Sequence, residues 1–198
     1  MKKPYRKIWL FAAILLLVFA GDGCGQKDQE VLVLLKSQSD PLFDELKTAA
    51  EQWAGEENVS IQIVAPKLSS IYEQQKITEN SIKNREWDLI VIEALSEDGM
   101  YPILDYAKYQ GSKIVSMQGM SKETADYTIR SSQDPEDTDW NRENMLLASL
   151  EVGSKAADGR IRDTQDKITT QVEGYRTLRL LGDGVYCGND VSTLSKED

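Results

Sequence analysis

Polar side chains that could hydrogen-bond a small ligand follow several short apolar runs in the first 120 residues. They carry hydroxyl, carboxylate or amide groups: Ser37, Asp40, Glu93, Ser96 and Gln118. Such groups can hydrogen-bond a small polar molecule, but they form no nucleophile and base pair. The sequence has no histidine, which removes the commonest general base and the commonest metal ligand. The residue types therefore favour binding over catalysis, and we expect no enzyme activity, no metal and no cofactor.

The elements that must position these side chains are four short apolar runs rich in branched residues. The runs are Val31–Leu35, Ile61–Val64, Leu89–Ile92 and Lys113–Ser116. Sequences with helical periodicity separate them, so the order predicts an α/β fold with a parallel sheet and helices on both faces. Ligands of such sheets bind at the carboxyl ends of the strands. We therefore expect the polar residues above to share one edge.

Charge and cysteine content limit the classes of partner. The formal net charge is −10, and an acidic surface disfavours nucleic acid and anionic lipid. The cysteines, Cys24 and Cys187, have no spacing typical of a metal site. A disulfide between them is one alternative, but Cys24 has another interpretation.

The N-terminal segment has the pattern of an export signal. A basic flank precedes an apolar run from Ile8 to Ala20, which is shorter than the roughly 20 residues of a membrane span. Gly23 and Cys24 follow, and the whole resembles a bacterial lipoprotein signal with Cys24 as the lipidated residue. This predicts a signal peptide over 1–23, a tether over 24–30 and a lipid anchor on the extracytoplasmic face of the cell membrane. The alternative is a secretory signal with an unrelated cysteine.

The stretch VLVLLKSQSDPLFDELKTAAEQWAGEENVSIQIV resembles the opening of the type I periplasmic sugar-binding proteins, relatives of the ribose- and galactose-binding proteins. The resemblance continues through WDLIVI and YAKYQGSKIVSM to about Met117. It implies a first ligand-binding lobe over 31–118 and a cleft for a sugar. It also implies a hinge near Gln118–Lys122 and an ABC-type permease as partner.

The same resemblance implies roles for individual residues. Asp40 stands where the family bonds sugar hydroxyls, and Phe43 stands where an aromatic ring packs on the sugar. Ser96 falls at the position of a ligand-binding aspartate, with Glu93 as an alternative contact, and Gln75 matches a glutamine of the following helix pattern. From the residues alone, Asp40 is equally a helix cap and Phe43 equally a core residue.

The region after Gln118 is expected to form a partial second lobe over 119–198. We predict a short strand at Asp126–Arg130 and helices at Asn141–Ala157 and Thr169–Leu181. Gly184–Asp190 resembles a second-lobe strand that ends in the ligand residue Asp190. The family runs to about three hundred residues, so the second lobe is either truncated or minimal.

Two other motifs resemble a calcium loop and a phosphate loop but lack residues that these sites require. The run that starts at Asp137 begins like a calcium loop, but Arg142 and Ala148 occupy the positions that need glycine and glutamate. Gly182 and Gly184 lack the spacing and the lysine of a phosphate loop.

Three functions remain open at this point. The first is a lipoprotein that binds a small polar ligand, a sugar by resemblance, for an importer. The second is a ligand-sensing or interaction module coupled to a membrane sensor kinase, or a truncated remnant that binds nothing. The third, a flavodoxin-like enzyme, is disfavoured because no catalytic constellation is visible.

Overall fold

The computed structural model describes residues 29–117, 120–121, 123–130, 142–160, 167–168, 177–181 and 184–188. Its strands are β1 (Glu30–Leu34), β2 (Ser60–Val64), β3 (Leu89–Ile92), β4 (Lys113–Met117), β5 (Tyr127–Arg130), β6 (Lys167–Ile168), β7 (Thr177–Leu181) and β8 (Gly184–Gly188). Its helices are α2 (Phe43–Glu57), α3 (Ile71–Asn84), α4 (Glu97–Tyr109) and α5 (Arg142–Ala157). None of these helices has the length and apolar character that a membrane crossing requires.

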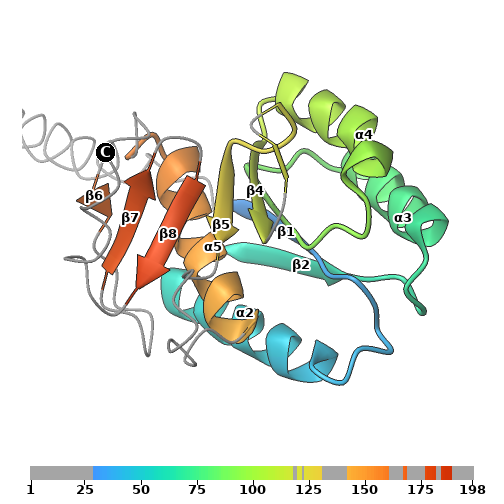
Figure 1. The fold of residues 1–198 in the computed structure, drawn as a ribbon, viewed down its shortest axis with the longest axis horizontal. Helices are drawn as coiled ribbons and strands as arrows, with labels where there is room; N and C mark the ends of the chain where they lie inside the picture. Colours follow the sequence, from blue (N-terminus) through green and yellow to red (C-terminus); the bar gives the residue numbers. More distant parts are fainter. Residues whose placement is uncertain are drawn as a thin grey trace, which may run out of the picture.

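The strands form one sheet in the order β2-β1-β3-β4-β5-β8-β7-β6 (Figure 1). Neighbours from β2 to β5 all pair in parallel, and β8 joins β5 in parallel as well. β7 pairs antiparallel with both β8 and β6. The predicted parallel α/β sheet is therefore confirmed, and the strand order switches direction at β1, where the carboxyl edge accommodates ligands in folds of this kind.

Helices cover both faces of the sheet, because successive residues of a strand point to opposite sides. Val31 and Val33 of β1 pack with α2 and α5 in one apolar cluster. Leu32 and Leu34 pack on the other face in a cluster that contains residues of α3 and α4. Burial on both faces explains why β1 and β3 are continuous apolar runs and show no alternation.

Glycine at position 153 lets α5 lie close to the sheet. A Cβ there would sit 2.3 Å from Leu89 Cδ1 and 3.0 Å from Val115 Cγ2. Such distances are far below van der Waals contact, so a larger residue would push α5 away from β3 and β4. Because Arg142 is the first residue of α5, Gly153 also helps to set where that side chain lies.

β5 and α5 belong to the same layers as the first half of the chain. The strand at Tyr127–Arg130 and the helix at Arg142–Ala157 agree with the sequence prediction. We predicted that both belong to a partial second lobe over 119–198. In the structure, β5 pairs with β4, and α5 packs on the sheet beside α2. The described part of that region thus belongs to the same sheet as the first half of the chain, and the division into two lobes stays a prediction.

The prediction of a helix over Thr169–Leu181 is wrong at its C-terminal end. Thr177–Leu181 is strand β7, and it pairs along its whole length with β8. Apolar Leu178, Leu180 and Leu181 satisfy a helical spacing as well as a strand, and pairing with a neighbouring strand decides between the two. Residues 169–176 lie outside the described ranges.

Candidate ligand-binding site

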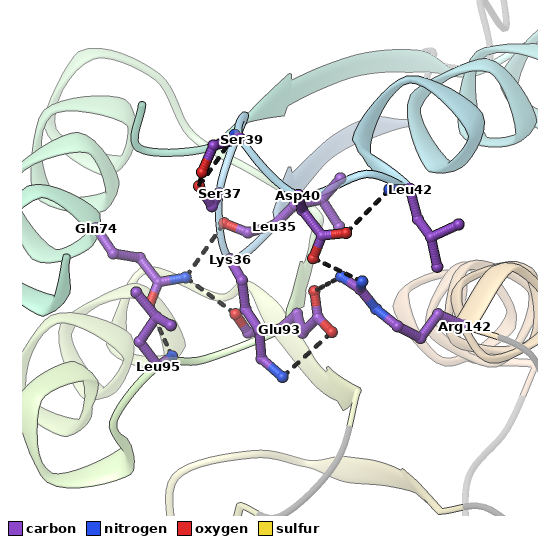
Figure 2. Close-up of polar contacts among 10 residues, drawn as sticks. All are labelled: Leu35, Lys36, Ser37, Ser39, Asp40, Leu42, Gln74, Glu93, Leu95 and Arg142. Atoms are coloured by element: carbon purple, nitrogen blue, oxygen red, sulfur yellow. Dashed lines mark hydrogen bonds and ion pairs between the residues drawn. The ribbon is translucent and has the colours of Figure 1, made fainter. Parts of the chain in front are cut away.

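Two carboxylates and two cations meet at the carboxyl edge of the sheet, beyond β1 and β3 (Figure 2). Lys36 and Asp40 follow β1, Glu93 follows β3, and Arg142 begins α5. We call this set the edge cluster: Lys36, Asp40, Glu93 and Arg142. The parallel sheet explains the gathering, because each strand delivers its C-terminal loop to the same edge.

Arg142 bridges the two carboxylates. Its Nη1 donates to Asp40 Oδ2 at 2.7 Å, and its Nη2 donates to Glu93 Oε2 at 2.6 Å. Lys36 Nζ lies 3.4 Å from the other oxygen, Glu93 Oε1. The Glu93 side chain is only 2% exposed, whereas that of Arg142 is 23% exposed. A carboxylate so deeply buried needs cationic partners, and the edge cluster supplies two of them.

Asp40 orients the turn into α2 and also contacts Arg142, while its role in binding a ligand stays a prediction. Its Oδ1 accepts a hydrogen bond from the Leu42 N–H at 3.0 Å and its backbone oxygen accepts from Phe43 N, so it organises the turn into α2. Its other oxygen faces Arg142. The Leu42 N–H, followed by the Arg142 guanidinium, lowers the pKa of Asp40 from its usual value, although partial burial acts in the opposite direction.

The charge of Arg142 responds to the same contacts. Hydrogen bonds to Glu93 and Asp40 raise the pKa of Arg142, although desolvation of the guanidinium acts against them. A cation in the first turn of a helix also opposes the helix dipole. The two carboxylates therefore offset both the burial and the unfavourable position of Arg142.

Gln74 of α3 holds the backbone below the edge cluster. Its Nε2 donates to Leu35 O at 3.3 Å and to Glu93 O at 2.9 Å, while its Oε1 accepts from Leu95 N at 2.9 Å. The side chain thus ties the end of β1 to the end of β3 (Figure 2). Gln75, which the family pattern singled out, donates to Gly99 O at 2.6 Å and joins α3 to α4 instead.

The other predicted residues at this edge have mainly structural contacts. Ser37 is buried, bonds Ser39 Oγ at 2.8 Å and lies 3.3 Å from Lys67 O. Ser96 caps α4 by accepting from Gly99 N at 3.3 Å. Phe43 packs against the apolar cluster of α2 and α5, in line with the core alternative. The structure describes five of the predicted site residues. Among these five, only Asp40 and Glu93 share a partner, which is Arg142.

Three predicted positions lie outside the described residues: Gln118, Asp190 and Cys24. Their roles, and those of the hinge and the lipid anchor, stay predictions. Arg142 and Lys36 are the contacts that we did not single out. The position of Arg142 at the start of a predicted helix carried a signal, because a helix after a parallel strand begins at the carboxyl edge.

Glu97, the first residue of α4, holds the segment between β4 and β5 by hydrogen bonds. Glu97 Oε1 accepts hydrogen bonds from Ser121 N at 2.7 Å and Thr124 Oγ1 at 3.0 Å. Hydrogen bonds from Ser121 and then Thr124 lower the pKa of Glu97, while partial burial acts in the opposite direction.

In the described ranges, no group of three or more histidine, cysteine or acidic side chains is placed to hold a metal ion.

No protein-family model matches this sequence, and no curated protein matches it. Solved structures do match. One is a solute-binding protein of an ABC transporter from Clostridium phytofermentas with bound L-rhamnose, at 21% identity and a TM-score of 0.48 over 52% of this chain and 32% of that one.

Two further structures come from other organisms. LsrB from Clostridium saccharobutylicum, in complex with AI-2, is 11% identical with a TM-score of 0.49 over 70% of this chain and 40% of that one. A periplasmic sugar-binding protein of an ABC sugar transporter from Legionella pneumophila is 20% identical with a TM-score of 0.47 over 66% and 45%.

The structural neighbours are type I periplasmic sugar-binding proteins. This is the family that the sequence resembles. The likeness covers 52% to 70% of this chain, and this chain spans less than half of the length of each of those three proteins. Two of them are described as a solute-binding protein and a periplasmic sugar-binding protein, and none of the three is described as an enzyme.

Proposed function

We propose that this chain is an extracytoplasmic solute-binding lipoprotein that binds a small polar, hydroxyl-rich ligand, a sugar, at the carboxyl edge of its sheet. The edge cluster is the observation that supports this most directly. It places two carboxylate acceptors and two cationic donors within one hydrogen-bonded group at the edge where parallel sheets bind ligands. Sugar hydroxyls both donate and accept, so they suit a site of mixed character.

The cluster has more donors than it uses. A guanidinium carries five N–H groups and an ammonium three. Among the described residues, Arg142 donates two of these bonds and Lys36 takes part in one ion pair. A ligand that supplies hydroxyl or ring oxygens would therefore find donors that the protein already holds in place, which reduces the entropy lost on binding.

Transport follows as part of the same proposal. Cys24 would carry the lipid anchor, the tether over 24–30 would hold the domain at the membrane, and an ABC-type permease would receive the ligand. The structural neighbours that bind L-rhamnose and other sugars belong to such transporters. Residues of 119–198 outside the described ranges would complete a cleft of which the described residues form one wall.

A second candidate function is a ligand-independent interaction module that a membrane sensor kinase reads. The observation that favours it is again the edge cluster, because Asp40 and Glu93 are already paired with Arg142. A ligand must compete with these ion pairs, and a module that binds nothing would keep them permanently. One neighbour is described as part of a XylFII–LytSN complex.

Thermal denaturation with a panel of pentoses, hexoses and inositols separates the two candidates. A ligand that binds only the folded state raises the melting temperature with its concentration. We expect at least one sugar to do so in the wild type and in Glu57→Gln, a control at the exposed end of α2. Asp40→Asn, which preserves size, should abolish the shift. A panel without any shift would favour the interaction module.

A further inference from the structure

A separate hollow lies at the opposite, amino-terminal edge of the sheet. Its volume is about 290 Å³, close to the lower limit of pockets that hold small molecules. The end of α3, the end of α4 and the start of β4 surround it. The lining residues are Ile82, Lys83, Asn84, Arg85, Glu86, Trp87, Tyr106, Gln110 and Ser112.

The last turn of α3 presents carbonyl oxygens without donors to this hollow. The helix ends at Asn84, and Arg85 after it is extended, so no left-handed cap folds back on the helix. Among the hydrogen bonds of the described residues, none reaches the carbonyl oxygens at positions 82–84. A helix C-terminus carries partial negative charge, which attracts a cation.

Aromatic rings provide a second feature that suits a cation. Trp87 is 4% exposed, and the Arg85 guanidinium lies 4.9 Å from its ring centroid. Its Nε1 donates to Ser81 O at 3.1 Å, which fixes the ring. Tyr106 contributes another ring, and its hydroxyl accepts from Gln110 Nε2 at 2.7 Å, so that Gln110 Oε1 is left as an acceptor. Positive charge is favoured over the face of such rings, and on Trp87 the Arg85 guanidinium already takes that place.

The charges around the hollow leave one carboxylate without compensation. Lys83 is paired with Glu79 at 2.6 Å, and Arg85 is paired with Glu30. Glu86 also lines the hollow and has no ion pair among the described residues. The lining of the hollow therefore contains acceptors and aromatic residues, while its two cations already have acidic partners.

We propose that this hollow, which we call the rear pocket, binds a small organic cation: an ammonium group on a short apolar chain. The ammonium would lie among the carbonyl oxygens of α3 and the Glu86 carboxylate, and the apolar chain would contact Ile82 and Trp87. The net charge of −10 would raise the local concentration of such a ligand. This site is independent of the carboxyl edge and of the function proposed for it.

Isothermal titration of the full chain in a nonionic detergent tests the proposal. The probes are choline and n-butylammonium, each compared with a neutral molecule of similar shape, 3,3-dimethyl-1-butanol and 1-pentanol. We expect saturable binding of at least one cation and at least about tenfold weaker binding of its neutral counterpart. The proposal is overturned if neither cation binds, or if the neutral counterpart binds as tightly.

Variants then place the binding in the rear pocket. Glu86→Gln should weaken cation binding about tenfold, because a charged partner becomes a neutral one. Because Glu86 is exposed, this variant should keep the wild-type fold, and circular dichroism checks this. Glu57→Gln and Asp40→Asn should leave cation binding unchanged. Equal loss in all three variants, or no loss in Glu86→Gln, would contradict the assignment.

Discussion

The two edges of the sheet differ in how far their polar groups are used. At the carboxyl edge, Arg142 and Lys36 pair with Glu93 and Asp40, and Gln74 fixes the backbone beneath them. At the amino edge, the last carbonyls of α3 and the Glu86 carboxylate line the rear pocket and have no donor or ion-pair partner among the described residues. The polar groups of the first edge are thus largely bonded to one another, whereas those of the second leave acceptors for a ligand. Stability should therefore depend on the first edge far more than on the second.

The comparison also indicates where α5 matters. α5 brings Arg142 to the carboxyl edge from a position 102 residues away from Asp40 along the chain. Gly153 allows that helix to lie close to the sheet. The amino edge is built from α3, α4 and the loops beside them, and these contacts are shorter in sequence. Changes in α5 should thus affect the two edges unequally.

Arg142→Ala should have the largest effect. It leaves Glu93, 2% exposed, with Lys36 as its remaining cationic partner in the described structure. Removing one member of a buried ion pair typically costs about 3 kcal/mol, so we expect a loss of that order in urea unfolding. Arg160→Ala is the matched control, since its pair with Asp158 is exposed and should contribute under about 1 kcal/mol. Similar losses in the two variants would show that the carboxyl edge is not special.

Gln74→Leu should have the next largest effect. The change removes bonds to Leu35 O, Glu93 O and Leu95 N in a buried position, which should destabilise the fold by about 2 kcal/mol. It should also weaken any sugar binding, because the loops after β1 and β3 lose their link. Hydrogen exchange of the Leu95 amide measures the local part. Protection as high as in the wild type would contradict a role for Gln74 at this edge.

Acid should weaken the carboxyl edge selectively. The pKa of Asp40 is lowered in the folded protein, so its contribution is present above the unfolded value of about 3.9 and is lost as the pH falls through the folded value. The stability difference between wild type and Asp40→Asn should hence be constant above about pH 5 and shrink toward pH 3. Urea unfolding at several pH values measures it. A difference that persists unchanged at pH 3 would mean that the Asp40 charge plays no part.

Much of the fold followed from local patterns. Val31–Leu35 and Leu89–Ile92 are continuous apolar runs that are too short for a typical helix. Such runs are typical of parallel strands that are buried on both faces, so both strands could be predicted. That topology in turn predicted the edge where Asp40 and Glu93 meet. Thr177–Leu181 was misassigned because its leucines fit two periodicities and only the pairing with β8 decides.

The contacts within the site were harder to foresee. Nothing near Asp40 in the sequence shows that Arg142 will pair with it, because the distance depends on how closely α5 packs on the sheet. The choice between Gln74 and Gln75 depends on the rotation of α3 about its axis, which a pattern of apolar residues defines only to within one position. Contacts between side chains depend on how distant segments pack, whereas the positions of strands depend largely on local sequence.

Arg85→Ala should have the smallest effect on stability, and it sharpens the comparison from the other side. Arg85 is 42% exposed, and it pairs with Glu30, reaches Ser60 Oγ at 3.1 Å and covers Trp87. Exposed pairs and cation–π contacts of this kind contribute up to about 1 kcal/mol together. In the rear pocket the same change removes the guanidinium from the Trp87 face, so a choline probe should bind equally well or more tightly. A loss of stability as large as that of Arg142→Ala would mean that the amino edge is as tightly constrained as the carboxyl edge, and a loss of choline binding would show that Arg85 holds the pocket open.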